Sequence, residues 1–118
     1  MKESVCMETI LRFGEGLDKE LFFPGCGEFK KESFLEAIDD DEAKMEEFYA
    51  NLEEVKKQLL LDLGFFMESD PAADSEEEVI MAYPGFKAIR YYRVAHLLRG
   101  MGYLLASRIL SEHAHYLT

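Results

Sequence analysis

Residues 42–67 read EAKMEEFYANLEEVKKQLLLDLGFFM, and their apolar side chains return at steps of three and four. This spacing places one apolar stripe along an α-helix. Its seven members are Met45, Phe48, Leu52, Val55, Leu59, Leu63 and Phe66. Three aspartates, 39–41, precede the stripe, and Asp both caps helix N-termini and suits the positive end of the helix dipole. We therefore predict one unbroken helix from about Glu42 to about Met67, the longest of the chain.

Helix signals also lie on both sides of this segment, whereas no segment alternates as a β-strand does. Gly14 and Gly16 predict the end of a first helix, and Ser75 with Glu78 has the pattern of a capping box. The other expected helices cover Glu3–Phe13, one or two turns within Leu17–Phe23, Lys31–Ile38, a short segment after Ser75, Pro84 to about Gly100, and Tyr103–Leu117. The 118 residues thus predict an all-α fold, a bundle of about five to six helices forming one domain over residues 1–118.

The helix expected after Pro84 is apolar almost all the way round. Nine of the 13 residues from Phe86 to Leu98 are apolar. The other four step by three and form a narrow basic stripe, Lys87, Arg90, Arg93 and His96. Such a helix is either central in its domain or part of a subunit interface, because full exposure would leave an aromatic patch too large for a monomer.

The formal net charge of −11 is unevenly distributed. Residues 1–80 hold 23 acids and eight bases, whereas residues 81–118 hold one acid and five bases. One interpretation is an acidic helical layer that pairs with a basic, more buried segment of the same domain, and the other is a basic segment that faces an anionic partner. We favour internal pairing. The net field argues against nucleic acid as a partner, because the phosphate backbone would be repelled.

The sequence also predicts neither a membrane span nor a secretion signal. No uncharged run exceeds eight residues, and a membrane-spanning helix needs about 20 apolar residues. The N-terminus lacks the basic-then-apolar order of a signal peptide. Cys6 and Cys26 have no metal-binding spacing, so we expect two reduced thiols in a cytoplasmic protein.

Few polar residues stand out as candidates for chemistry. His96 lies among apolar neighbours, which favours a hydrogen-bonded core histidine over a catalytic base. His113 and His115 are two residues apart and so point to different sides of a helix, which argues against zinc. The aspartates at 39–41 lack the glycine and distal glutamate of a calcium loop. Asp70, followed by Pro71, is the best single candidate, and its simplest interpretation is a helix N-cap.

Several motifs together resemble the N-terminal helical domain of serine O-acetyltransferases. They run in order from Asp70 to the last residue: 70-DPA-72, 83-YPGFKAI-89, 92-YRVAH-96 and 111-SEHAHYLT-118. The earlier 21-LFFPG-25 is similar to the bacterial branch that has a longer N-terminal region. Each motif alone is weak, but as an ordered set they are specific.

The resemblance implies an acyltransferase of cysteine biosynthesis, which moves acetyl from the co-substrate acetyl-CoA to L-serine. In that family the catalytic residues and the CoA groove lie in a left-handed parallel β-helix of hexapeptide repeats that follows the helical domain. This sequence ends at Thr118, where the β-helix is expected to begin. The resemblance therefore implies no catalytic residue, cofactor or metal in this chain, and no activity of this chain by itself.

One site residue follows from the resemblance. The family aspartate that matches Asp70 contacts the amino group of serine and of the feedback inhibitor cysteine. The family also implies self-association through the helical domain, as a dimer of this chain and a hexamer of the longer protein, and binding of O-acetylserine sulfhydrylase by a C-terminal tail. The alternative hypothesis is a stand-alone helical module for oligomerisation or scaffolding, without catalysis.

Overall fold

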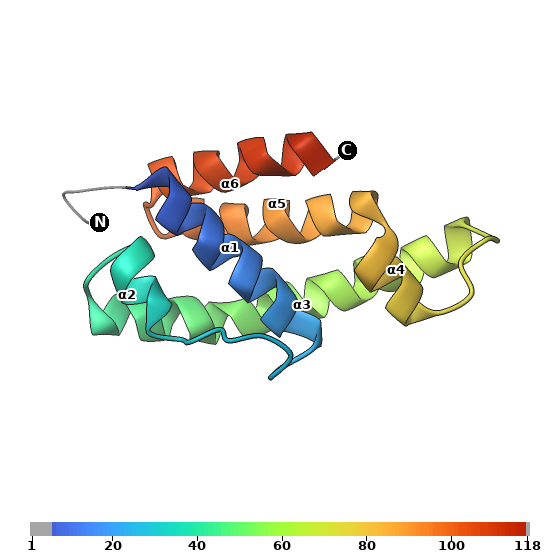
Figure 1. The fold of residues 1–118 in the computed structure, drawn as a ribbon, viewed down its shortest axis with the longest axis horizontal. Helices are drawn as coiled ribbons and strands as arrows, with labels where there is room; N and C mark the ends of the chain where they lie inside the picture. Colours follow the sequence, from blue (N-terminus) through green and yellow to red (C-terminus); the bar gives the residue numbers. More distant parts are fainter. Residues whose placement is uncertain (1–5, 118) are drawn as a thin grey trace.

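A computed structural model describes residues 6–117, and within them the chain forms six helices and no strand. The helices are α1 (Met7–Phe22), α2 (Ser33–Ala37), α3 (Glu42–Ser69), α4 (Glu76–Ala82), α5 (Pro84–Gly100) and α6 (Leu104–Leu117). In Figure 1, α3, α5 and α6 run along the long axis of the molecule, and α1 crosses them. The predicted all-α fold is confirmed.

The long central stripe forms the helix that its spacing predicts. α3 runs unbroken over 28 residues, two residues further than predicted. Asp41 caps its start, because its carboxylate accepts a hydrogen bond from the Lys44 N–H at 3.1 Å. Met45, Phe48 and Leu59 of the stripe are buried in the core.

The first helix is longer than predicted. α1 continues through Gly14 and Gly16 to Phe22, so the expected stop at these glycines is wrong. The start of the predicted segment, at Glu3, lies outside the described residues. A Cβ atom on Gly14 would lie 2.7 Å from Leu110 Cδ2, and one on Gly16 would lie 2.9 Å from the Phe29 ring. Both glycines thus allow close packing and do not end the helix.

We expect alanine to be tolerated poorly at Gly14 and well at Gly64, an exposed glycine of α3. Both substitutions gain helix propensity, about 0.8–1.0 kcal/mol. Only Gly14→Ala overpacks the core, which costs about 1–3 kcal/mol, because nothing lies within 4 Å of a Cβ on Gly64. Urea unfolding of the two variants gives this difference directly, and equal stabilities would contradict the close-packing interpretation.

The short helix α2 is held by aromatic side chains. It spans five residues of the predicted Lys31–Ile38 segment, too few to be stable alone. Phe34 is fully buried and contacts four other rings, with centroid distances of 5.3 to 6.4 Å. These rings belong to Phe13 of α1, Phe48 and Tyr49 of α3, and Tyr103 before α6.

The nearly all-apolar helix is central. α5 packs against α1, α3, α4 and α6 (Figure 1). Arg90 forms a bidentate ion pair with Asp18 of α1, and Arg93 forms one with Asp62 of α3. Two of the four residues of the basic stripe therefore pair with acidic residues of the same domain, which supports the interpretation of the uneven charge as internal pairing.

Candidate functional site

Asp70 lies in the loop between α3 and α4, at one end of the molecule (Figure 1). Its Oδ1 accepts a hydrogen bond from the Ala72 N–H at 2.9 Å, which closes a turn directly after α3. The next helix begins only at Glu76, where the Ser75 hydroxyl accepts from the Glu78 N–H at 3.2 Å. The prediction that Asp70 caps a helix is therefore wrong.

Two local interactions explain this difference. The Asp70 carboxylate already accepts a hydrogen bond from the backbone N–H two residues later. It therefore closes a turn, and α4 does not start there. Ser75 is a strong cap, and three glutamates in the first turn of α4 complement the positive end of its dipole. The capping motif at Ser75 thus determines where the helix begins, as the sequence predicted.

Tyr83 is a neighbour of Asp70 that sequence reasoning did not assign to the site. The interaction of its hydroxyl with the Asp70 carboxylate is the main cause that raises the pKa of Tyr83 to about 12. Burial and the negative charges of Asp70, Glu78 and Asp74 act in the same direction. Asp70 is thus held between a backbone N–H and a phenol, in a loop rich in negative charge.

This loop favours a cation over an anion. Residues 68–78 contain six acidic side chains and no basic one. Asp70 is half-buried, so its carboxylate is held in place and is still accessible from one side. An ammonium group beside such a carboxylate gains a charge-assisted hydrogen bond. The geometry therefore suits a ligand that carries a primary amine.

The three histidines lie elsewhere. His96 is exposed on α5, so its prediction as a core histidine is wrong. The helix turns it toward solvent, whereas Ala95 and Leu98 on the same helix face the core. His113 packs against Tyr91 with ring centroids 5.0 Å apart, and His115 packs against Tyr92 at 6.2 Å. Within residues 6–117 no group of three potential ligands is placed to hold a metal ion.

The remaining polar candidates have structural surroundings. Asp39 accepts a hydrogen bond from the Tyr103 hydroxyl at 2.6 Å, which lowers the pKa of the Asp39 carboxyl. Cys6 and Cys26 are both exposed and form no disulfide. Across the described part of the chain, no helix is long and apolar enough to cross a membrane.

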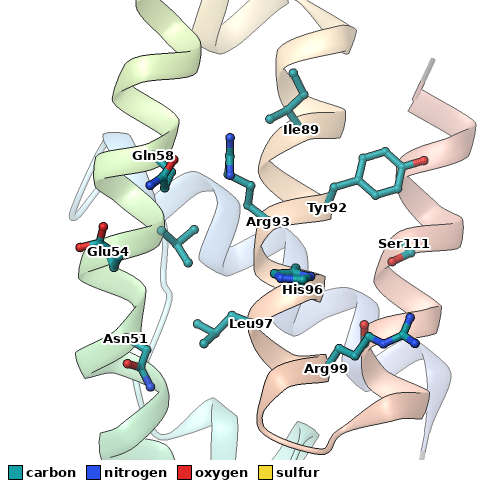
Figure 2. A pocket seen from close by; sticks show the side chains of 12 residues that line it. Asn51, Glu54, Gln58, Ile89, Tyr92, Arg93, His96, Leu97, Arg99 and Ser111 are labelled. Carbon is teal, nitrogen blue, oxygen red and sulfur yellow. The ribbon is translucent and has the colours of Figure 1, made fainter.

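A groove of about 690 Å³ runs along the exposed side of α5, between α3 and α6 (Figure 2). Leu97 and Arg93 point toward α3, whereas Tyr92 and Arg99 point toward α6. His96 lies between these two sides. The groove was not predicted from the sequence, because the helices that line it meet only in the folded chain. It shares no residue with the Asp70 loop.

Comparisons with known proteins agree with the sequence motifs, although no family model matches the chain. A plasmid-encoded serine acetyltransferase of Synechococcus elongatus is 29% identical over 109 residues, which cover 92% of this chain and 34% of that protein. The serine acetyltransferase of Helicobacter pylori is 38% identical over 63 residues, covering 50% and 37% of the two chains. A further serine acetyltransferase of Synechococcus elongatus is 40% identical over 62 residues, covering 52% and 25%.

The chain thus spans about a quarter to somewhat over a third of the length of these curated relatives. The matched region is all-helical within residues 6–117. Three separate relatives of one kind, one of them matched over nearly the whole chain, confirm the resemblance that the motifs indicated. The chain is therefore similar to serine acetyltransferases, and its described residues form a helical domain.

Proposed function

We propose that this chain is the N-terminal helical domain of a serine O-acetyltransferase, which transfers acetyl from acetyl-CoA to L-serine. The observation that carries the proposal is the match over 92% of the chain, combined with an ordered aspartate in the motif 70-DPA-72. In this proposal the chain supplies a substrate contact, and a β-helical domain that follows α6 supplies the catalytic residues and the acetyl-CoA groove.

The geometry supports such an arrangement. Figure 1 shows the α3–α4 loop and the C-terminal end of α6 in the same half of the molecule. A domain that continues from α6 would begin on the side where Asp70 lies. The acidic residues in and beside that loop, six within residues 68–78, would then lie toward a substrate that carries an ammonium group.

The reading frame beyond Thr118 is the first test. Hexapeptide repeats directly downstream would support the acetyltransferase, and a stop codon there would favour a stand-alone helical module. Release of free CoA, measured with serine and acetyl-CoA, is the biochemical test. We expect turnover by a protein that contains the repeats and none by residues 1–118 alone, because in this proposal the catalytic residues and the acetyl-CoA groove lie in the β-helical domain. Turnover by the short chain would contradict the proposal.

In an acetyltransferase that contains this domain, Asp70→Asn should raise the KM for serine by about tenfold or more. A hydrogen bond to a charged group contributes about 1.5–3 kcal/mol, which corresponds to this range. Inhibition by cysteine should weaken in parallel, while the KM for acetyl-CoA stays unchanged. The asparagine Oδ1 can still accept from the Ala72 N–H, so the turn is preserved and only the charge is lost.

The matched control is Asp40→Asn, which removes an exposed carboxylate near the start of α3, at the other end of that helix from Asp70. It should leave both serine KM and cysteine inhibition unchanged. An unchanged serine KM in a folded Asp70→Asn protein would show that Asp70 only closes the turn.

Self-association belongs to the same proposal, but its basis differs from the one that the sequence suggested. Because α5 packs against four other helices of its own chain, we place the interface on another surface. Exposed apolar side chains lie instead on α3, where Leu61 is 72% and Phe65 is 70% exposed, one helical turn apart. We propose that two copies of the chain meet through this face.

Sedimentation at micromolar concentration should therefore show a dimer that strengthens as added salt screens the charge of −11 on each copy. The double variant Leu61→Ser/Phe65→Ser should weaken it, because two large apolar side chains leave the interface. Leu104→Ser/Leu105→Ser on α6 is the matched control and should leave the dimer unchanged. A strict monomer in moderate salt would contradict self-association, and a dimer lost only in the control would place the interface on α6.

A further inference from the structure

The groove along α5 is lined by a charged side chain that forms no ion pair among the described residues. Arg90 and Arg93 of the same helix are paired with Asp18 and Asp62. Arg99 is exposed and takes part in no ion pair among the described residues. An unpaired arginine at the edge of a hollow is the donor that carboxylates and phosphates prefer, because its fork of N–H groups binds two oxygens.

Three residues with hydroxyl groups line the same groove as this arginine. Tyr92, Ser107 and Ser111 line the groove on the side of α6, as Arg99 does. In Figure 2, Ser111 of α6 lies on the side of α5 to which Arg99 points. A second hollow of about 550 Å³ shares these four residues and adds Arg108 and His115 from α6. Arg99 thus lines both hollows, as do the hydroxyl-bearing Tyr92, Ser107 and Ser111.

Negative groups near Arg99 are few, although the protein is strongly acidic overall. Glu112 faces the second hollow, and it is paired with Arg108 at 3.0 Å on the same helix. Glu54 is the single acid that lines the main groove, and it comes from α3 on the other side of α5. The local balance around Arg99 therefore favours an anion.

The side of the groove toward α3 is mixed, because the polar Asn51, Glu54 and Gln58 line it beside apolar side chains. Val55 of α3 and Ile89 and Leu97 of α5 line it, and all three are half-buried. The volume of about 690 Å³ is within the range of small-molecule sites, about 300–1,000 Å³. The groove thus has three apolar side chains among polar ones, and an arginine and hydroxyl-bearing side chains on the side toward α6.

We propose that this groove binds a small organic anion, with a carboxylate or phosphate held by Arg99 on the side toward α6. The site is separate from Asp70 and opposite to it in charge preference. It does not depend on the proposed acetyltransferase activity, and a failure of either proposal leaves the other standing.

The test is a titration of the 15N-labelled chain with benzoate, phenyl phosphate and the neutral analogue benzyl alcohol, followed by NMR chemical-shift changes. We expect saturable shifts for residues of the groove, such as Leu97 and Ser111, with at least one of the two anions at concentrations up to about 10 mM. The comparison of benzoate with phenyl phosphate shows whether the site prefers carboxylate or phosphate. Benzyl alcohol should bind at least about tenfold more weakly, because it lacks the charge.

Arg99→Gln should weaken binding of the preferred anion by about tenfold or more. Lys87→Gln is the matched control, since Lys87 lies on the same helix outside the groove, and it should leave the affinity unchanged. Both positions are accessible on α5, so both variants should keep the helical circular dichroism spectrum. Three outcomes would overturn the proposal: no saturable shifts with either anion, equal affinity for benzyl alcohol, or unchanged binding in Arg99→Gln.

Discussion

Arg90→Met should lower the free energy of unfolding by about 3–5 kcal/mol, because removal of one partner of a buried ion pair leaves the other charge buried without compensation. The Arg90 guanidinium binds both carboxylate oxygens of Asp18, at 2.5 and 3.0 Å, and donates to the Ile80 carbonyl at 3.0 Å. The two side chains are only 5% and 8% exposed. Arg90 thus connects α5 to both α1 and α4. Urea unfolding followed by circular dichroism measures the loss.

The same helix offers a matched control. Arg93 also forms a bidentate pair, with Asp62, but these two side chains are 36% and 21% exposed. Because solvent screens such a pair, Arg93→Met should cost about 1 kcal/mol or less. The double variant Asp18→Leu/Arg90→Met should regain much of the stability, since an apolar pair of similar volume often replaces a buried ion pair at little cost. Equal losses in Arg90→Met and Arg93→Met would contradict the role assigned to burial.

A loss of similar size is expected for Phe34→Ala. Phe34 is fully buried, and its truncation leaves a cavity among four aromatic rings. Phe→Ala changes in cores cost about 3–5 kcal/mol. Helix α2 has only five residues and depends on this side chain for its attachment, so the segment around it should lose protection against hydrogen exchange as well.

Tyr116→Ala is the control for this aromatic substitution, because Tyr116 is 88% exposed on α6. It should change the unfolding free energy by no more than about 0.5 kcal/mol. A cost for Phe34→Ala below about 1 kcal/mol would show that the aromatic cluster can collapse around the cavity, and that α2 is held by other contacts.

The sequence alone was sufficient for the features that depend on neighbours within one or two turns. The stripe from Met45 to Phe66 predicted α3, and the cap at Ser75 predicted the start of α4. Both depend on hydrogen bonds and side-chain periodicity between residues at most a few positions apart. The all-α class follows from the same local signals, and the ordered motifs after Asp70 indicated the family.

Part of the candidate site could also be predicted. Asp70 was identified through its motif, but its partner Tyr83 was not, because the two lie on either side of α4 and meet only when that helix folds back. The groove around Arg99 could not be predicted either, since its walls come from α3, α5 and α6. Whether His96 faced the core or the groove depended on which side of α5 the other helices cover.

The sequence by itself thus determined the all-α class, the long helix α3, the cap at Ser75 and the family resemblance, whereas the tertiary structure determined which faces are covered and which charges pair. Gly14 illustrates the reason: locally it resembles a helix stop, but its role comes from Leu110, almost one hundred positions away. Arg90 and Asp18 are separated by 72 positions in the same way. Local signals specify the backbone conformation of a segment, and they contain no information about the distant side chain that will meet it, because that contact exists only after the helices have packed.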